Sequence, residues 1–378
     1  MKIAVNLLPI REKLGGGGKY SQMILSEISK IDIENDYYLF VSEKGKINFQ
    51  INKKNFKFII ANFNPESVLS RIFWEQIIFP IKLKLLKPDL VFVPAVAIPF
   101  LFKGKFLTTI HDIAYKKNKL KYSWLRSKYI SFVTAISLKK SDTIFTVSDF
   151  SKHEIENEFK VKQKKILITY NGVNEGFFKV YDQNQILDFK KRFNLPNKFI
   201  LYVGAIEPGK NLDKLFIAFS ILSEEYTDFR LVLTSGIGWS QSVLFDLIDK
   251  LNLRSKIIFL PYIQDKELPF LYKSATLLAY LSEYEGFGIP VLEAMASGIP
   301  VITSNSDAIK EFAGDAVLSV NPSIIEEVVS GLRKIIDDTK YNEQLVKTGL
   351  QRARNFTWNR SAQIILDRIN SYNGNNRN

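Results

Sequence analysis

The stretch from Ser282 to Asn305 reads SEYEGFGIPVLEAMASGIPVITSN and carries the clearest structural pattern of this chain. Its glycines and prolines divide it into three parts. Pro290 suits the first turn of a helix, and good helix formers follow it over 291–296. Gly298 and Pro300 end that helix, and an apolar run begins directly after them. The stretch therefore predicts a loop, a short helix and a strand in succession.

Two carboxylates stand out in this stretch. Glu285 lies in the predicted loop, on a flexible approach to the helix, and Glu293 is predicted in the first helical turn. Carboxylates accept hydrogen bonds from sugar hydroxyls and a helix N-terminus attracts phosphate, so the layout suits a phosphorylated, polyhydroxylated ligand. Acids near a helix N-terminus also stabilise the helix dipole by ~0.3–1 kcal/mol without binding anything. The spacing alone leaves both interpretations open.

Bulk composition predicts two globular domains. A chain of 378 residues exceeds the usual size of one core, and 46% of its residues are hydrophobic. Cysteine is absent, which excludes disulfides, cysteine metal sites and thiol catalysis. Residues 1–8 read as a first strand rather than a signal peptide, and no uncharged apolar run reaches the length of a membrane span. We therefore expect a cytoplasmic protein.

The net charge of +13 lies entirely in the first half of the chain. Residues 1–190 hold 31 basic and 18 acidic residues, whereas the remainder holds 21 of each. The excess peaks at 116–129, where lysines alternate with Trp124, Tyr122 and Tyr129. A solvated lysine-rich face, an anionic membrane surface and a nucleic acid are the three interpretations, in that order, and no nucleic-acid motif accompanies the cluster.

Apolar runs alternate with amphipathic segments along the whole chain, which is typical of doubly wound α/β sheets. Helices are predicted at 328–336 and 358–372, and the connection between domains at 165–197. The predicted strands are 2–8, 37–41, 57–60, 90–93, 106–110, 143–147, 199–203, 230–233, 257–260, 276–280 and 300–303.

The 282–305 stretch resembles the signature of the family 4 retaining glycosyltransferases, P-S-x-x-E-G-F-G-x-P-x-x-E-A-M-A-x-G-x-P-V, with Leu281 in place of the usual proline. The resemblance extends in order over nearly the whole chain. It implies a GT-B fold: two Rossmann-like, doubly wound parallel-sheet domains with a cleft between them. The expected acceptor-binding domain is 1–175, the expected nucleotide-sugar domain is 176–356, and 357–378 would form a helix that crosses back, with a frayed tail.

Several shorter segments resemble further parts of the family. The run Gly15 to Gly18 is similar to its phosphate-contacting loop, which implies that Gly15 and Gly16 lie at the donor. His111 ends a predicted strand and is similar to a histidine near the reacting sugar, although a structural histidine remains an alternative. His153 lies in a polar helical stretch, and we expect it at the surface.

The second half carries the expected phosphate-binding cation. The segment from Gly204 to Lys210 resembles V-G-x-x-x-P-x-K-N of the family, which implies a phosphate contact for Lys210, although an exposed lysine has no such role by default. Many members carry an arginine at a position that is Ala205 or Gly209 here, so one cation of the expected pair is missing. The loops at 234–239 and 260–263 are similar to loops of the nucleotide pocket, with the base near Tyr262.

The resemblance implies a role for each residue of the signature. Glu293 would hold the ribose and Glu285 the sugar hydroxyls. Three groups are implied to be catalytic: His111, Lys210 and Glu285. The residues implied to bind the donor are Gly15, Gly16, Gly204, Lys210, Tyr262, Glu285, Gly286, Phe287, Gly288, Ile289 and Glu293.

The implied activity is retaining transfer of a hexose from a nucleotide diphosphate sugar to a saccharide acceptor that is lipid-linked, in cell-surface polysaccharide synthesis. Mannose from a GDP-linked donor is favoured over glucose, galactose or N-acetylhexosamine from UDP-linked donors. No metal and no cofactor are expected, and the basic first half suggests a peripheral contact with the inner face of the membrane. The alternatives are a phosphorylase or sugar-nucleotide epimerase, a non-catalytic sugar-nucleotide-binding protein, and an unrelated nucleic-acid-binding protein.

Overall fold

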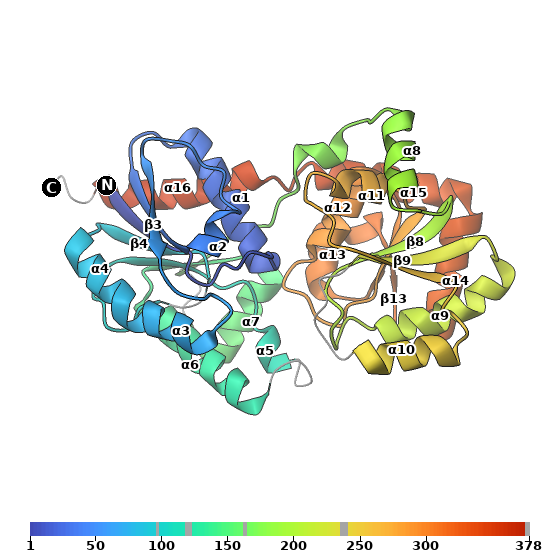
Figure 1. The fold of residues 1–378 in the computed structure, drawn as a ribbon, viewed down its shortest axis with the longest axis horizontal. Coiled ribbons are helices and arrows are strands. Elements are labelled where there is room, and N and C mark those ends of the chain that lie inside the picture. The colour runs from blue at the N-terminus through green and yellow to red at the C-terminus, as the bar shows by residue number, and fades with distance from the viewer. Residues whose placement is uncertain (96–97, 118–122, 162–164, 235–240, 375–378) are drawn as a thin grey trace. The chain divides into compact units, whose positions relative to one another are not determined.

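The computed structural model describes residues 1–95, 98–117, 123–161, 165–234 and 241–374. It consists of two units, which Figure 1 shows as two groups of helices around separate sheets. The first unit comprises Met1–Gly172 together with Thr357–Asn378, and the second comprises Val173–Phe356. The chain therefore enters the second unit once and returns once, so that its C-terminal helix belongs to the first unit.

The first unit is built on a seven-stranded sheet in which every pair of neighbours is parallel, in the order β3-β2-β1-β4-β5-β6-β7. The strands are mostly buried and rich in apolar residues, because helices cover both faces of such a sheet. They are β1 (Lys2–Asn6), β2 (Asp36–Ser42), β3 (Phe56–Ala61), β4 (Leu90–Val93), β5 (Phe106–Thr109), β6 (Thr143–Thr146) and β7 (Ile166–Ile168).

The described helices of the first unit are α1 (Gly16–Ile31), α2 (Glu43–Lys46), α3 (Val68–Phe73), the π-helical turn η1 (Trp74–Ile78), α4 (Phe79–Leu86), α5 (Ala114–Lys117), α6 (Trp124–Lys140), α7 (Asp149–Phe159) and α16 (Trp358–Gly374). The C-terminal α16 packs alongside α1 (Figure 1).

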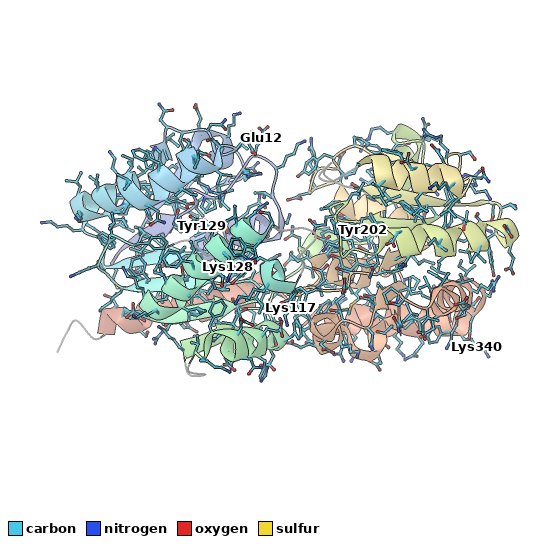
Figure 2. All side chains as sticks on the ribbon, turned by 90° about the horizontal axis from the view of Figure 1, so that it is seen from below. Glu12, Lys117, Lys128, Tyr129, Tyr202 and Lys340 are labelled. Carbon is cyan, nitrogen blue, oxygen red and sulfur yellow. The ribbon has the colours of Figure 1, made fainter. Side chains whose placement is uncertain are left out.

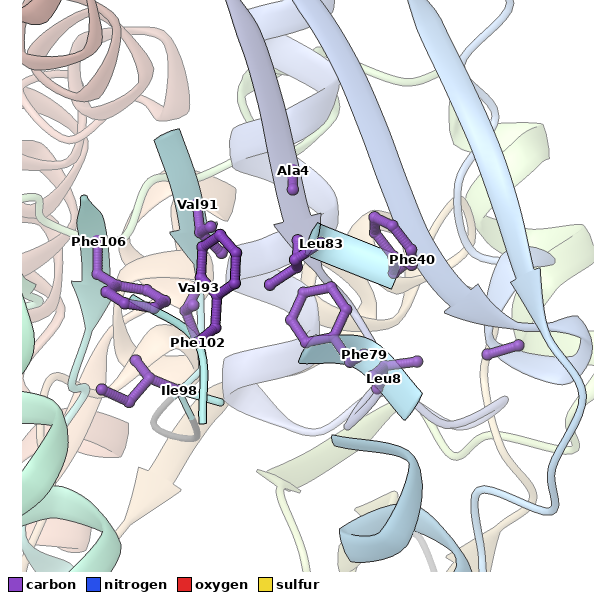
Figure 3. Packing of buried hydrophobic residues seen from close by; sticks show 11 residues of the cluster. Ala4, Leu8, Phe40, Phe79, Leu83, Val91, Val93, Ile98, Phe102 and Phe106 are labelled. Atoms are coloured by element: carbon purple, nitrogen blue, oxygen red, sulfur yellow. The ribbon is translucent and has the colours of Figure 1, made fainter. Parts of the chain in front are cut away.

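The core of the first unit joins the sheet to α4. Phe79 and Leu83 are four residues apart, so they lie on one face of α4, and both are fully buried. They pack against Ala4 of β1 and Phe40 of β2 (Figure 3). The rings of Phe40 and Phe79 are 4.9 Å apart and nearly edge to face. One face of α4 is therefore held firmly in the core.

The second unit has a six-stranded parallel sheet in the order β10-β9-β8-β11-β12-β13. Its strands are β8 (Lys198–Val203), β9 (Phe229–Thr234), β10 (Ile257–Leu260), β11 (Leu277–Tyr280), β12 (Val301–Ser304) and β13 (Leu318–Val320). The described helices are η3 (Glu175–Phe178), α8 (Gln183–Arg192), α9 (Leu212–Glu225), α10 (Gln241–Lys250), α11 (Leu268–Ser274), α12 (Ile289–Ser297), α13 (Asp307–Ala313), η4 (Gly314–Ala316), α14 (Ile325–Asp337) and α15 (Thr339–Ala353).

Both sheets reverse their strand order at one point, between β1 and β4 in the first unit and between β8 and β11 in the second. Connections leave such a point in opposite directions and open a crevice at the carboxyl ends of the strands, where open α/β sheets bind ligands. The loops that follow β8 and β11 carry Lys210 and Glu285. The topology thus places the two charged candidates of the second half at one sheet edge.

All eleven predicted strands are present within a few residues of their expected bounds, and the prediction of two doubly wound parallel sheets is confirmed. The chain passes from the first unit to the second between Gly172 and Val173, inside the connection predicted at 165–197, and that range also contains β7 and α8. Neither β7 nor β13 was predicted. Both missed strands are three residues long, too short for a recognisable apolar run.

No helix among the described residues is long and apolar enough to cross a membrane. Of the predicted frayed tail at 373–378, residues 373 and 374 belong to α16 and the rest lie outside the described residues, as do 118–122 of the predicted basic cluster.

Candidate functional site

Hydrogen bonds on either side of Lys210 join the loop that follows β8 to the loop that follows β11. The N–H of Glu283 donates to the carbonyl of Gly209 at 2.7 Å. The side-chain amide of Asn211 donates to the carbonyl of Leu281 at 2.8 Å. Gly209 has φ 85, a conformation that glycine adopts without strain. These contacts fix the backbone on either side of Lys210 against the loop that carries Glu285.

Lys210 and Glu285 form a half-buried ion pair. Lys210 Nζ lies 2.6 Å from Glu285 Oε1 and 3.8 Å from Glu207 Oε1. The hydroxyl of Tyr280, the last residue of β11, donates to the same Glu285 oxygen at 2.6 Å. The two side chains of the pair are 14% and 15% exposed. Glu285 is therefore held by two donors, and the prediction that it lies on a flexible approach is wrong.

The electrostatics of this cluster keep both partners charged. Burial alone would raise the pKa of Glu285, but the charge and hydrogen bond of Lys210 lower it below its usual range. Burial alone would lower the pKa of Lys210, and Glu285 raises it above its usual range instead. The pKa of the Tyr280 hydroxyl is raised by burial and by the charge of Glu285, so it remains a hydrogen-bond donor. A charged ammonium and a carboxylate thus stand side by side.

Glu293 lies one turn deeper than the sequence predicts. The helix α12 begins at Ile289, so Glu293 is its fifth residue and belongs to the second turn, and the prediction of a first-turn position is wrong. The residue is 7% exposed, and its Oε2 accepts a hydrogen bond of 2.9 Å from the hydroxyl of Tyr272 in α11. The Tyr272 hydroxyl thus helps to orient this nearly buried carboxylate.

The glycine loop before α12 allows close packing. Gly288 caps the helix with φ 111, and a Cβ there would lie 3.1 Å from Ile309. Gly286 and Phe287 are buried, and the ring of Phe287 stacks on Phe312 at 4.4 Å. The N–H of Ile289 belongs to the first turn of the helix, where backbone donors have no partner within the helix.

Two further residues predicted to bind the donor, Gly204 and Tyr262, differ in their surroundings. Gly204 follows β8 with φ 154, and a Cβ there would approach the rings of Tyr202 and Tyr280, so this glycine lies beside the Lys210 cluster. Tyr262 follows β10 and is 54% exposed. Of the predicted nucleotide loop at 234–239, residues 235–239 lie outside the described part of the chain.

The glycine run of the first unit is not the loop that the sequence predicts. Gly16 begins α1 and Gly15 is its N-cap, so the glycines from 16 onward form the first helical turn. A Cβ at Gly15 or Gly16 would meet nothing within 4 Å. A Cβ at Gly17 would lie 3.2 Å from His111 Nε2, which makes Gly17 the glycine that contacts the histidine.

The surroundings of His111 favour its neutral form. Burial lowers its pKa, against the opposing charge of Asp112 and the hydrogen bond to Pro94. His111 Nε2 lies 3.1 Å from the carbonyl oxygen of Pro94, which can only accept, so Nε2 carries the proton and Nδ1 keeps its lone pair. The ring of Tyr20 packs edge-on at 4.9 Å and fixes the plane of the imidazole.

The sequence missed the tyrosines that hold these groups. Tyr280 and Tyr272 hold the two glutamates, while Tyr20 orients His111 and donates to or accepts from Thr169 at 2.8 Å. One signal was available: Tyr280 ends an otherwise aliphatic strand at the edge where ligands bind. Tyr272 and Tyr20 lie in amphipathic helices, where a tyrosine is indistinguishable from a core residue.

Two other predictions concern charged surface residues. His153 is 57% exposed at its side chain and pairs with Asp149 at 3.0 Å, as a surface histidine would. Two lysines of the predicted basic cluster, Lys116 and Lys117, pair with Glu158 and Glu154 of α7. No group of three or more His, Asp or Glu side chains among the described residues is placed to hold a metal ion.

Comparison with known proteins places the chain in a family. Residues 183–352 match the model of "Glycosyl transferases group 1", and residues 22–177 match that of "Glycosyltransferase Family 4". The chain is 31% identical over 268 residues to O-antigen chain mannosyltransferase B of Escherichia coli, covering 70% of this chain and 69% of that one.

Solved structures share the fold at low identity. A sucrose-phosphate synthase from Thermosynechococcus elongatus superposes with a TM-score of 0.80 at 19% identity, covering 98% of both chains. Anabaena Alr3699/HepE, solved in complex with UDP-glucose, superposes with a TM-score of 0.79 at 16% identity, over 98% of this chain and 99% of that one. With its two Rossmann-like units and its family matches, the chain belongs to the family 4 glycosyltransferases of the GT-B fold.

Proposed function

We propose that this protein is a retaining hexosyltransferase that moves a hexose from a nucleotide diphosphate sugar to a saccharide acceptor. Mannose from a GDP-linked donor is the favoured pair, because the chain is 31% identical over 268 residues to an O-antigen mannosyltransferase. UDP-linked hexoses are the next candidates, since a similar structure was solved with UDP-glucose. The acceptor would be a lipid-linked saccharide of surface polysaccharide synthesis.

One observation carries the proposal: Lys210 Nζ and Glu285 Oε1 lie 2.6 Å apart at the reversal point of the second sheet. A diphosphate needs a cation, and the hydroxyls of a sugar need a fixed acceptor beside it. The pair supplies both at the edge where open α/β sheets bind nucleotides. Donor binding would replace the contact between Lys210 and Glu285 by one from Lys210 to phosphate and one from Glu285 to a sugar hydroxyl.

The chemistry requires stabilisation of a leaving diphosphate. As the bond between the anomeric carbon and the phosphate oxygen breaks, negative charge develops on that oxygen. Lys210 and the N-terminal turn of α12 would take up this charge, and removing one such donor typically costs ~10²–10³ in rate. The acceptor oxygen would attack from the same face and pass its proton to the leaving phosphate, which retains the anomeric configuration. We assign Glu285 to sugar binding rather than to nucleophilic attack.

Glu293 and the remaining residues would position the donor. The carboxylate of Glu293, oriented by Tyr272, would accept hydrogen bonds from both ribose hydroxyls. The backbone around Phe287, Gly288 and Ile289 would assist. Roles for Gly15, Gly16 and His111 at the sugar and its phosphate, and for Tyr262 at the base, stay predictions from the family resemblance. The proposed reaction needs neither a metal nor a cofactor.

The first unit offers a place for the acceptor. A hollow at the carboxyl ends of β2 and β3 is lined by Lys44, Asn62 and Asn64, whose side chains can bind hydroxyls, and by Phe63, which can pack on a sugar ring. We propose that a saccharide acceptor binds here. Its lipid would place the protein at the inner face of the membrane.

A two-stage experiment tests the function. Thermal shift with UDP-, GDP- and dTDP-linked sugars identifies the donor, and NMR of the product formed with a saccharide acceptor reports the anomeric configuration. We expect one donor to stabilise the protein, and a product of the same configuration as that donor. An inverted product would overturn the retaining mechanism, and no stabilisation by any sugar nucleotide would overturn the function.

A second candidate is a non-catalytic sugar-nucleotide-binding protein, which the absence of an arginine at 205 and 209 favours. It would show the thermal shift without transfer or donor hydrolysis. Conversion of the donor sugar without any acceptor would indicate an epimerase instead.

A further inference from the structure

An apolar stripe runs along one side of the helical segment α3–η1–α4. It consists of five side chains at every fourth position, each between 41% and 81% exposed. They are Leu69, Phe73, Ile77, Ile81 and Leu85. Single exposed apolar residues are ordinary, but a continuous row of five on one element marks an interaction surface.

The π-helical turn η1 keeps the stripe in line. In an α-helix of 3.6 residues per turn, a step of four residues overshoots a full turn by roughly 40°, so five such positions would spiral away from one face. The turn from Trp74 to Ile78 has i→i+5 bonding and rotates less per residue. It lies in the middle of the stripe and brings Ile77 and Ile81 back under Leu69 and Phe73.

The opposite side of the same segment is locked into the protein. Phe79 and Leu83 pack in the core of the first unit, as Figure 3 shows, and Glu75 is 3% exposed with Arg71 at 3.7 Å. The segment cannot roll to bury its stripe without opening this core. The exposed row is therefore a fixed feature of the surface.

A second helix extends the apolar surface. Trp124, Leu125 and Phe132 of α6 are 59% to 73% exposed. Two contacts connect α6 to η1 through Phe100. The backbone N–H of Phe100 donates to the side-chain oxygen of Gln76 in η1 at 2.9 Å, and the ring of Phe100 lies 6.1 Å from the ring of Phe132 in α6. Figure 2 labels Lys128 and Tyr129 on α6.

The charge around this surface has one sign. Segments 68–87 and 124–140 contain eight lysines and arginines and a single acid, the buried Glu75. Lys82, Lys84, Arg126 and Lys128 are exposed beside the apolar side chains. Apolar residues flanked by lysine and arginine fit the boundary between acyl chains and anionic headgroups, where a helix lies in the plane of the membrane.

We propose that the stripe and its extension on α6, named here the lipid-facing surface, dock the first unit onto an anionic lipid bilayer. The inference rests on the proposed function, because an enzyme with a lipid-linked acceptor has to reach the membrane that holds this acceptor. The proposed acceptor hollow ends at Asn62–Pro65, and α3 begins at Val68 directly after it. A saccharide in the hollow would have its lipid next to the inserted side chains.

Vesicle flotation tests this with the full chain. The wild type should bind vesicles that contain phosphatidylglycerol, bind vesicles of phosphatidylcholine alone much more weakly, and release partly at high salt because the charges are screened. Leu69→Gln/Phe73→Gln/Leu85→Gln should lower the partition coefficient about tenfold or more, since binding scales with buried apolar area. Lys82→Gln/Lys84→Gln should weaken the preference for anionic vesicles, because two of the four exposed cations named above are removed.

The matched control is Val180→Gln/Val243→Gln/Ile324→Gln, three exposed apolar residues of the second unit, 99%, 61% and 41% exposed, which should bind vesicles as the wild type does. Equal vesicle binding by the stripe variant and the wild type would overturn the proposal. The proposal would also be overturned if sedimentation equilibrium showed a dimer for the wild type and a monomer for the stripe variant while neither protein bound vesicles. The donor should shift the melting temperature of the stripe variant as much as that of the wild type. A failure of the proposed function would therefore appear in the thermal-shift assay, and a failure of the docking proposal in the vesicle assay.

Discussion

Lys210 Nζ lies 2.6 Å from Glu285 Oε1, although the two residues come from different loops and 75 positions separate them. The contact gives the proposed phosphate-binding cation a carboxylate partner before any donor is present. With Glu207 at 3.8 Å from the same ammonium, two acids compete with a phosphate for one lysine. If Lys210 binds the donor phosphate as proposed, donor binding would rearrange this cluster.

Replacing the lysine should separate catalysis from stability. Lys210→Met should lower kcat/KM by ~10²–10³ because the leaving diphosphate loses its cation. It should also lower the melting temperature, since Glu285 is left without its counter-charge in a half-buried place. The double variant Lys210→Met/Glu285→Gln should recover the melting temperature without recovering activity. Recovery of activity in the double variant would contradict the assigned role.

Adding the missing cation should depend on where it is placed. Gly209 has φ 85, so Gly209→Arg should cost of order 1–3 kcal/mol in stability through backbone strain. Ala205 is exposed, so Ala205→Arg should leave stability unchanged and bind a nucleoside diphosphate about tenfold more tightly, ~1.4 kcal/mol. Calorimetric titration with UDP and GDP checks the affinity. Equal affinities for Ala205→Arg and the wild type would show that position 205 does not reach the phosphates.

The contact between Tyr272 and Glu293 can be tested by removing one hydroxyl. Tyr272→Phe keeps the buried ring and removes the 2.9 Å hydrogen bond to Glu293. We expect a weaker thermal shift by the donor, and no shift in Glu293→Ala. A ribose-free sugar phosphate separates the roles, because its binding should be equal in all three proteins. If Glu293→Ala still responds to the nucleotide sugar, Glu293 does not hold the ribose.

Glu75 should give the protein a pH-dependent stability. Burial raises its pKa from 4.5 to about 7, against the opposing charge of Arg71. Between these values the folded state holds a proton that the unfolded state releases, so the free energy of unfolding falls as pH rises through this window. Glu75→Gln should remove this fall. Above pH 7 the free energy of unfolding of the variant should exceed that of the wild type by at most ~3 kcal/mol. Urea melts at pH 4.5 and 8 measure the difference, and parallel pH profiles would contradict it.

Gly172 is the residue at which the chain passes out of the first unit. The space around its Cα is too small for a side chain. A Cβ there would lie 2.2 Å from the backbone nitrogen of Trp358 and 2.5 Å from the carbonyl carbon of Thr357. Gly172→Ala should therefore destabilise the protein by ~1–3 kcal/mol through overpacking. Gly15→Ala is the matched control, because nothing lies within 4 Å of its added methyl group. Similar melting temperatures for the two variants would refute the steric argument.

Local sequence patterns are enough to predict the alternation of strands and helices and to recognise the family. Continuous apolar runs such as Leu90–Val93 can be buried only in a covered sheet, and the spacing of glycine, proline and glutamate in 282–305 is specific enough to name the candidate ligands. These features can be read from the sequence because the residues that produce each of them are close together in the chain.

The way in which the candidate residues are held depends on contacts between elements that are distant in the chain. The strand order places β8 beside β11 and so brings Lys210 to Glu285, and no pattern within either loop records that contact. The partners of Glu285 and Glu293, the choice of Gly17 over Gly16 beside His111, and the exposed side of α4 were all outside the reach of the sequence. Each depends on which elements pack together, and the crossover connections between strands, rather than the local order of residues, determine that.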